Sequence, residues 1–248
     1  MNDPIGLRPR AEKLRLYGLL GEWGRLGNEP WVVELIDLEE RERGRRSREY
    51  RLHQASIGHF KSMVDFDWKH PTKIDRLLVE DLLGLDFMTD AANVILLGPN
   101  GVGKTMIAQN LAFASVQAGR ATRFVVASDM LNDLASQDGS ALRQRLKLYV
   151  NPKLLVIDEV GYLRYDNRYA DLLYEVIRRR YEQRRSVVIS TNKPFGEWNS
   201  VFESAACLTT LIDRLCHRAE IVEIQGESYR VKEAKARKTE RRSRRRES

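Results

Sequence analysis

Short apolar runs alternate with longer amphipathic stretches through most of the chain. The apolar runs have the composition of buried strands and lie at 93–97, 123–127, 153–158, 186–191 and 220–224. Between them, apolar positions recur every three or four residues and predict helices at 106–118, 129–136, 140–150, 168–183 and within 201–217. Strands that alternate with helices predict an α/β fold, with a parallel sheet flanked by helices on both faces.

The first part of the chain has helical periodicity only. Residues 11–26 place Leu14, Tyr17 and Leu20 on one face and predict a single helix, and a second helix is expected from Trp31 to about Ala55. A further helix is expected over 74–83. We therefore expect four regions, which are a helical module that binds DNA or a partner (1–60), a linker with a lead-in helix (61–85), an α/β core (86–231) and a basic tail (232–248).

The loop after the first core strand carries the motif G-x-x-x-x-G-K-[ST]. Its residues are Gly98, Pro99, Asn100, Gly101, Val102, Gly103, Lys104 and Thr105, and Met106 continues into the next helix. A strand, a glycine-rich turn and a helix N-terminus form a cradle of backbone N–H groups for phosphates. Lys104 would reach the β- and γ-phosphates, and the Thr105 hydroxyl would ligate Mg²⁺. The sequence therefore predicts a site for a nucleoside triphosphate with Mg²⁺.

Polar side chains also follow two later apolar strands. Asp158 and Glu159 come at the end of 153–158, where Asp158 would hold Mg²⁺ and Glu159 would polarise the attacking water. Asn192 follows 186–191, and its amide could orient that water or contact the γ-phosphate. A simple turn before Pro194 is the alternative for Asn192. The residues after Lys193 lack the guanine-reading carboxylate of a GTPase, so we expect a hydrolytic ATP switch.

The charge of the chain is concentrated at its end. The net charge is +7, and residues 232–248 contribute nine basic residues against three glutamates. This segment has no apolar side chain larger than alanine, so it cannot bury a face of its own. Its candidate DNA contacts are Lys235, Arg237, Arg241 and Arg242. A solubilising tail is the alternative.

A second basic segment lies at 39–51, where six arginines alternate with four glutamates. Arginine forms forked contacts with phosphate, which favours a DNA-binding helix. The candidate contacts are Arg41, Arg45, Arg46 and Arg48. Mixed charges at these spacings are equally typical of a solvated helix, so both interpretations stand.

Composition points to the cytoplasm. No apolar run approaches the ~20 residues of a membrane span, and the first ten residues lack the apolar stretch of a signal peptide. Cys207 and Cys216 form no C-x-x-C pair and are expected as packing residues in a reducing compartment.

The core motifs resemble those of the IstB-type ATPases, which assist the transposases of bacterial insertion sequences, and of the related DnaC-type helicase loaders, both of the AAA+ class. The resemblance runs from about Leu14 to Lys232. The motifs that carry it lie at 98–105, 154–162, 190–198, and 212–217 together with 226–230. Within 190–198, Thr191-Asn192 stands in place of the usual Ser-Asn.

The resemblance implies roles that the residues alone do not. Arg214 matches the arginine that an AAA+ subunit inserts into a neighbour's site, which makes hydrolysis depend on a homo-oligomer with ATP at its interfaces. Arg230 matches a second phosphate sensor. Since few residues follow Arg230, we expect no full C-terminal lid domain, as in IstB-type proteins.

Together these features predict a bacterial ATPase that binds duplex DNA with little sequence preference and assists a cognate transposase. When bound to DNA it would associate with the nucleoid, and we expect no membrane among its partners. A replicative helicase loader acting with single-stranded DNA is one alternative. A scaffold that binds ATP structurally and DNA only through its tail is another.

Overall fold

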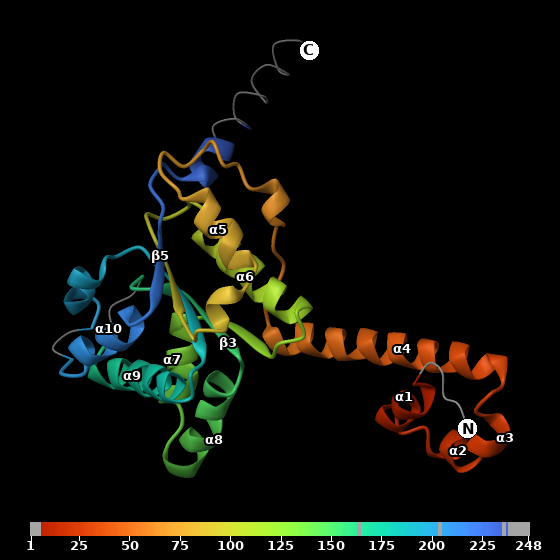
Figure 1. The fold of residues 1–248 in the computed structure, drawn as a ribbon. Helices are drawn as coiled ribbons and strands as arrows, with labels where there is room; N and C mark the ends of the chain where they lie inside the picture. The colour runs from red at the N-terminus through yellow and green to blue at the C-terminus, as the bar shows by residue number, and fades with distance from the viewer. Residues whose placement is uncertain (1–5, 163–164, 203–204, 235–236, 238–248) are drawn as a thin grey trace, which may run out of the picture. The chain divides into compact units, whose positions relative to one another are not determined.

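The computed structural model describes residues 6–162, 165–202, 205–234 and 237. The chain divides into two compact units between Tyr50 and Arg51, and each is described by itself (Figure 1). We expected the N-terminal module to extend to residue 60, whereas residues 51–60 group with the second unit. Within the described ranges, no helix has the length and apolar character needed to cross a membrane.

The first unit is helical. Its helices are α1 (Leu7–Lys13), α2 (Tyr17–Gly21), α3 (Trp23–Leu26) and most of α4 (Pro30–Ala55). The prediction of one helix over 11–26 is wrong, because Arg15 has a φ of 56° and the backbone leaves the helix there. The core of this unit joins α1 to α4 through Leu7, Ala11, Leu14, Val32 and Ile36.

The second unit is built on a sheet of five parallel strands. The strands are β1 (Asn93–Leu97), β2 (Thr122–Val126), β3 (Leu154–Val160), β4 (Ser186–Thr191) and β5 (Ala219–Glu223). Their order across the sheet is β2-β3-β4-β1-β5. All four pairings are parallel, which confirms the predicted α/β class.

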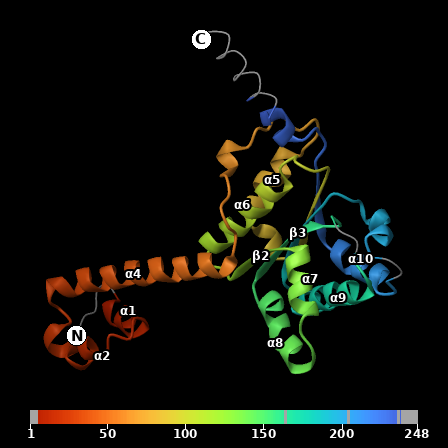
Figure 2. The same cartoon turned by 180° about the vertical axis from the view of Figure 1, so that it is seen from behind.

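Helices cover both faces of this sheet, as Figures 1 and 2 show. On β1, Val94 and Leu96 face one core while Ile95 faces the other, because side chains alternate along a strand. The Val94 face packs against α5 (Arg76–Leu83) and α6 (Lys104–Gln117). The opposite face packs against α7 (Ala127–Ala135), α8 (Gly139–Val150), α9 (Asn167–Glu182) and α10 (Leu208–Cys216). Short 3₁₀ helices complete the unit at Met63–Asp65, Asp86–Met88 and Phe195–Ser200.

Parallel pairing gives the sheet two chemically different edges. The loops after β1, β3 and β4 all leave from the carboxyl edge, where ligands bind in open α/β sheets. The turns that lead from α9 into β4 and from α10 into β5 lie at the opposite, amino edge. Any site formed at one edge is separated from the other by the length of the strands, roughly 15 Å for five residues.

A buried arginine on α9 stabilises the amino edge. Arg180 has no exposed surface, and its guanidinium donates to the carbonyl oxygens of Tyr149, Val150, Pro152, Lys153 and Ser186 at 2.6–3.2 Å. These carbonyls belong to the end of α8, the turn into β3 and the first residue of β4. The last carbonyls of a helix have no partner within the helix, so Arg180 supplies one from outside.

We expect Arg180→Met to lower the free energy of unfolding by about 3 kcal/mol or more, because it leaves five carbonyl oxygens without this donor. Arg179→Met is the matched control. Its side chain is partly exposed and pairs with Glu175 at 2.6 Å, so the same measurement should fall by less than about 1 kcal/mol. Chemical denaturation of the full chain measures both, and equal losses would contradict this role for Arg180.

Candidate functional site

The glycine-rich loop lies between β1 and the amino end of α6. Gly101 and Gly103 have φ values of 81° and 105°, which glycine adopts without steric cost. Gly103 is the residue directly before α6, so the loop delivers the chain to a helix start whose first N–H groups have no helical partners. The backbone therefore has the form of an anion cradle.

The same glycines also allow close packing against other parts of the protein. A Cβ on Gly98 would lie 2.2 Å from the carbonyl oxygen of Ile224, just after β5. A Cβ on Gly101 would meet Ser228, and one on Gly103 would meet the Phe66 ring. The loop is thus enclosed by the chain after β5 and by the segment before α5.

Lys104 lies inside this loop rather than in solvent. It is 8% exposed, and its Nζ donates to the carbonyl oxygens of Gly98 and Pro99 at 2.6 and 2.7 Å. Burial lowers the pKa of Lys104, with a smaller contribution from Arg230, while the carboxylates of Asp158 and Glu159 oppose the shift. A phosphate group would give this buried ammonium an anionic partner in addition to the two carbonyl oxygens.

The two acidic residues are presented by an irregular end of β3. The pairing of β3 with β4 shifts between Ile157 and Val160, and Glu159 has a φ of 61°, which is unusual for a residue with a side chain. Asp158 is 2% exposed, whereas Glu159 is exposed and lines the cavity described below. The bulge therefore turns two consecutive carboxylates toward different parts of the same edge.

Ser190 on β4 holds this bulge in place. Its hydroxyl donates to Oδ1 of Asp158, and its oxygen accepts from the backbone N–H of Glu159 at 2.9 Å. One side chain thereby fixes both residues. Ser190 is not among the residues predicted for the site, and the available signal was a small polar residue directly after the apolar run 187–189.

Asn192 lies directly after β4 and faces the same cavity. Its Oδ1 is buried and has no hydrogen-bond partner among the described residues. A buried acceptor without a partner is costly unless a ligand or water satisfies it. This observation fits the predicted role of Asn192 in orienting water, which stays a prediction.

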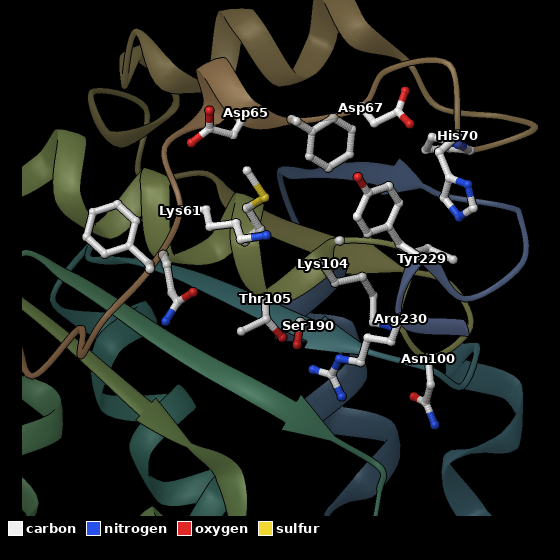
Figure 3. Close-up of a pocket in the computed structure, with 18 of the residues that line it drawn as sticks. Lys61, Asp65, Asp67, His70, Asn100, Lys104, Thr105, Ser190, Tyr229 and Arg230 are labelled. Carbon is white, nitrogen blue, oxygen red and sulfur yellow. The ribbon is translucent and has the colours of Figure 1, made fainter. Parts of the chain in front are cut away.

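These groups meet in one cavity of about 760 Å³ (Figure 3). The predicted residues that line it are Asn100, Gly101, Val102, Gly103, Lys104, Thr105, Met106, Glu159, Asn192 and Arg230. Gly98, Pro99 and Asp158 are not among the lining residues, but the carbonyl oxygens of Gly98 and Pro99 accept from Lys104 and the Asp158 carboxylate accepts from Ser190. The volume lies within the range typical of small-molecule sites.

A segment expected to be only a linker forms another wall of the cavity. Figure 3 shows Lys61, Asp65, Asp67 and His70 of this segment along one side, with Tyr229 nearby. Asn110 of α6 anchors the segment by donating to the Lys61 carbonyl at 2.9 Å. The His70 and Tyr229 rings pack edge to face, with centroids 5.0 Å apart. The aromatic and acidic content of 65–70 was the only sequence signal for this wall.

Arg214 does not reach the cavity of its own chain. It lies in a second pocket of about 260 Å³, together with Tyr181, Arg184, His217 and Arg218. That pocket also contains Asn93 and Val187, at the starts of β1 and β4, so it belongs to the amino edge. A role for Arg214 at a phosphate would thus require a second molecule.

The predicted DNA contacts on α4 are exposed and partly neutralised. Arg45 pairs with Glu42 and Glu49, and Arg46 shares Glu42. The Arg41 side chain donates to the Asp37 carbonyl at 3.2 Å, and Arg48 is exposed. Arg237 in the tail is exposed, while Lys235, Arg241 and Arg242 lie outside the described residues.

The five-stranded sheet with its covering helices has an AAA+-like fold. The DnaC helicase loader has a TM-score of 0.54 and 20% identity, covering 64% of this chain and 96% of that chain. AMPPCP-bound DnaA from Aquifex aeolicus has a TM-score of 0.52 and 16% identity, covering 71% of this chain and 56% of DnaA. This chain therefore spans little more than half of DnaA, and both likenesses concern the fold alone.

The chain belongs to the family of IstB-like ATP binding proteins, whose family model matches residues 10–237. The relative from insertion sequence IS5376 of Geobacillus stearothermophilus is 34% identical over 205 residues, covering 82% of this chain and 81% of the relative. The relative from insertion sequence IS21 of Pseudomonas aeruginosa is 36% identical over 192 residues, covering 77% and 72%. Both relatives are named for ATP binding.

The contact between Gly98 and Ile224 gives a direct test of how the loop is packed. We expect Gly98→Ala to lower the free energy of unfolding by about 1–3 kcal/mol, because the new Cβ would force the backbone carbonyl of Ile224 aside. Gly196→Ala is the control, since a Cβ there meets nothing within 4 Å. Chemical denaturation that gave the two variants equal stability would contradict the described packing.

Proposed function

We propose that this protein is an Mg²⁺-dependent ATPase that assembles on duplex DNA and assists the transposase of its insertion sequence. The observation that carries the proposal is the convergence of Lys104, Glu159 and Asn192 on one cavity next to the helix start at Thr105. The family of the chain supports ATP as the nucleotide. The names of its relatives support the context of an insertion sequence.

Each residue of the cavity has a chemical task in this proposal. The loop N–H groups and Lys104 bind and orient the phosphates, so that little reorganisation remains for the reaction itself. Glu159 accepts a proton from the attacking water, and the free Oδ1 of Asn192 accepts a hydrogen bond from the same water. Ser190 keeps Glu159 in its strained position. Arg230 adds positive charge beside the phosphates.

The donor set near the loop suits Mg²⁺. The Thr105 hydroxyl and the Asp158 carboxylate would hold the ion, and both are oxygen ligands of the kind it prefers. Ser190 engages only Oδ1 of Asp158 among the described contacts. Bound Mg²⁺ would reduce the negative charge of the phosphates.

Completion of the site would require a homo-oligomer. Arg214 is at the amino edge of its own sheet, so it could stabilise γ-phosphate charge only in the site of a neighbouring copy. Hydrolysis would then depend on assembly, and assembly would depend on ATP.

The DNA contact is proposed to use the phosphate backbone. The arginines of α4 and the basic residues after Lys232 are suited to phosphates and carry no base-reading motif. Binding would thus be largely independent of sequence, and the transposase would recognise the assembled complex as a target. The protein would bind its DNA and its transposase in the bacterial cytoplasm. The helicase-loader alternative has the same fold, and membership of the IstB-like family favours transposition over it.

Two substitutions separate nucleotide binding from hydrolysis. We expect Glu159→Gln to retain ATP affinity while hydrolysis falls by roughly a hundredfold or more, because the general base is lost. The DNA-bound assembly should then persist in ATP. Equilibrium binding of a fluorescent ATP analogue, phosphate release and DNA retention measure the three properties.

Lys104→Ala is the companion variant. It should lose ATP binding and, with it, ATP-dependent assembly on DNA, because the buried ammonium that faces the phosphates is removed. Normal assembly of Lys104→Ala on DNA in the presence of ATP would contradict the switch.

A further inference from the structure

The peptide that follows Asn192 is fixed by two side chains. At the end of β4, the Thr191 hydroxyl donates to the carbonyl oxygen of Lys193 at 3.1 Å and accepts from the backbone N–H of the same residue at 3.2 Å. The indole N–H of Trp198 donates to that carbonyl oxygen at 3.2 Å. A carbonyl oxygen has two lone pairs, so both are occupied, one from β4 and one from the turn beyond it.

Trp198 is anchored in the core. It has no exposed surface, and its ring packs against those of Phe195 and Phe202, with centroid distances of 4.9 and 5.7 Å. Close packing of this kind leaves the ring little freedom to move. The indole N–H is the only hydrogen-bonding group of this side chain, and it is directed at the carbonyl of Lys193. The core therefore sets the position of a peptide at the edge of the candidate site.

Pro194 restricts the same peptide. A proline ring disfavours the helical conformation of the residue before it, which favours extended backbone angles at Lys193. Pro194 is itself extended, with φ −62° and ψ 153°, and the 3₁₀ helix Phe195–Ser200 starts directly after it. That short helix brings Trp198 back to the peptide that it bonds. The motif at 190–198 thus has a structural explanation that a simple turn does not supply.

The Asn192 side chain depends on this backbone for its direction. Its Oδ1 is buried and has no hydrogen-bond partner among the residues that the structure describes. A Cβ on Gly161 would lie 3.7 Å from that oxygen, so the amide lies beside the turn two residues after Glu159. Because Oδ1 makes no hydrogen bond of its own, the backbone on either side decides where the amide oxygen points.

We propose that Trp198 and Thr191 are positioning residues for ATP hydrolysis, which hold the Asn192 amide at the attacking water by fixing the Lys193 carbonyl. Neither residue lines the cavity, so their effect on the reaction passes through Asn192. This inference rests on the proposed function, in which Asn192 accepts a hydrogen bond from the water. It adds the part of the structure that keeps the amide in place.

The first test compares Thr191→Val with Thr191→Ser. Valine keeps the shape of this buried side chain and removes both hydrogen bonds to Lys193, whereas serine keeps the hydroxyl. Thr191→Val should lower kcat by roughly tenfold, as expected for a small displacement of a reacting group, while ATP affinity changes by less than about twofold. Thr191→Ser should retain most of kcat.

Phosphate release at saturating ATP and duplex DNA measures kcat, and equilibrium binding of a fluorescent ATP analogue measures affinity. Equal kcat values for the valine and serine variants would overturn the inference, because the hydroxyl would then have no part in hydrolysis.

Trp198→Phe tests the second donor. Phenylalanine keeps a ring in the aromatic cluster and removes the indole N–H, so kcat should again fall by roughly tenfold at unchanged ATP affinity. Phe202→Leu is the matched control, since it reduces packing in the same cluster and its side chain has no hydrogen-bonding group. It should lose thermal stability and keep kcat. Equal falls in kcat would reduce Trp198 to packing and overturn the inference. Thr191→Val carries the test by itself if the tryptophan variant does not fold.

Combination with Asn192→Ala separates positioning from general stabilisation. Groups that act as one unit have non-additive effects. In the Asn192→Ala background, Thr191→Val and Trp198→Phe should each lower kcat by less than about twofold, since the amide that they position is already gone. Losses as large as those in the unaltered chain would overturn the inference.

Failure of the inference differs from failure of the proposed function. If Asn192→Ala loses hydrolysis while Thr191→Val keeps the full kcat, the proposed function stands and the inference is wrong. If Thr191→Val also loses ATP binding, the whole site is disturbed and the inference is again wrong. If Asn192→Ala itself keeps the full kcat, the proposed role of Asn192 in hydrolysis fails, and the inference fails with it.

Discussion

One hydroxyl group joins the two central strands at the candidate site. Ser190 donates to Asp158 and accepts from the Glu159 backbone, so β4 holds the irregular end of β3 in its left-handed conformation. Without this link, the backbone N–H of Glu159 would lose the hydrogen bond that holds its strained conformation, which places the side chain at the cavity. The positions of the acidic pair and of Asn192, two residues after Ser190, all follow from the register of these two strands.

The parallel sheet then separates the chemistry of the protein into two edges. The carboxyl edge holds a cavity enclosed by the glycine-rich loop, the segment before α5 and the residues after β5. The amino edge holds a second pocket, which Arg214 lines. Because the length of the strands separates the two edges within one chain, the proposed use of Arg214 at a phosphate requires a second copy.

The sequence predicted those parts that consist of consecutive residues. The strand, loop and helix around Lys104 and the acidic end of β3 depend on local spacing, and the alternation of strands with helices predicted the α/β class. Ser190, Phe66 and Tyr229 were missed because only tertiary contacts bring them to the site. The helix over 11–26 was wrong because periodicity cannot show that Arg15 leaves the helical conformation.

The proposed function requires that ATP controls assembly on DNA. The most direct measurement is the mass of particles formed by the full chain on a random-sequence duplex, at fixed salt, with ATP, with ADP and without nucleotide. We expect large DNA-bound particles with ATP only. Equal binding under all three conditions would contradict it, because the DNA contact would then be electrostatic attraction without a nucleotide switch.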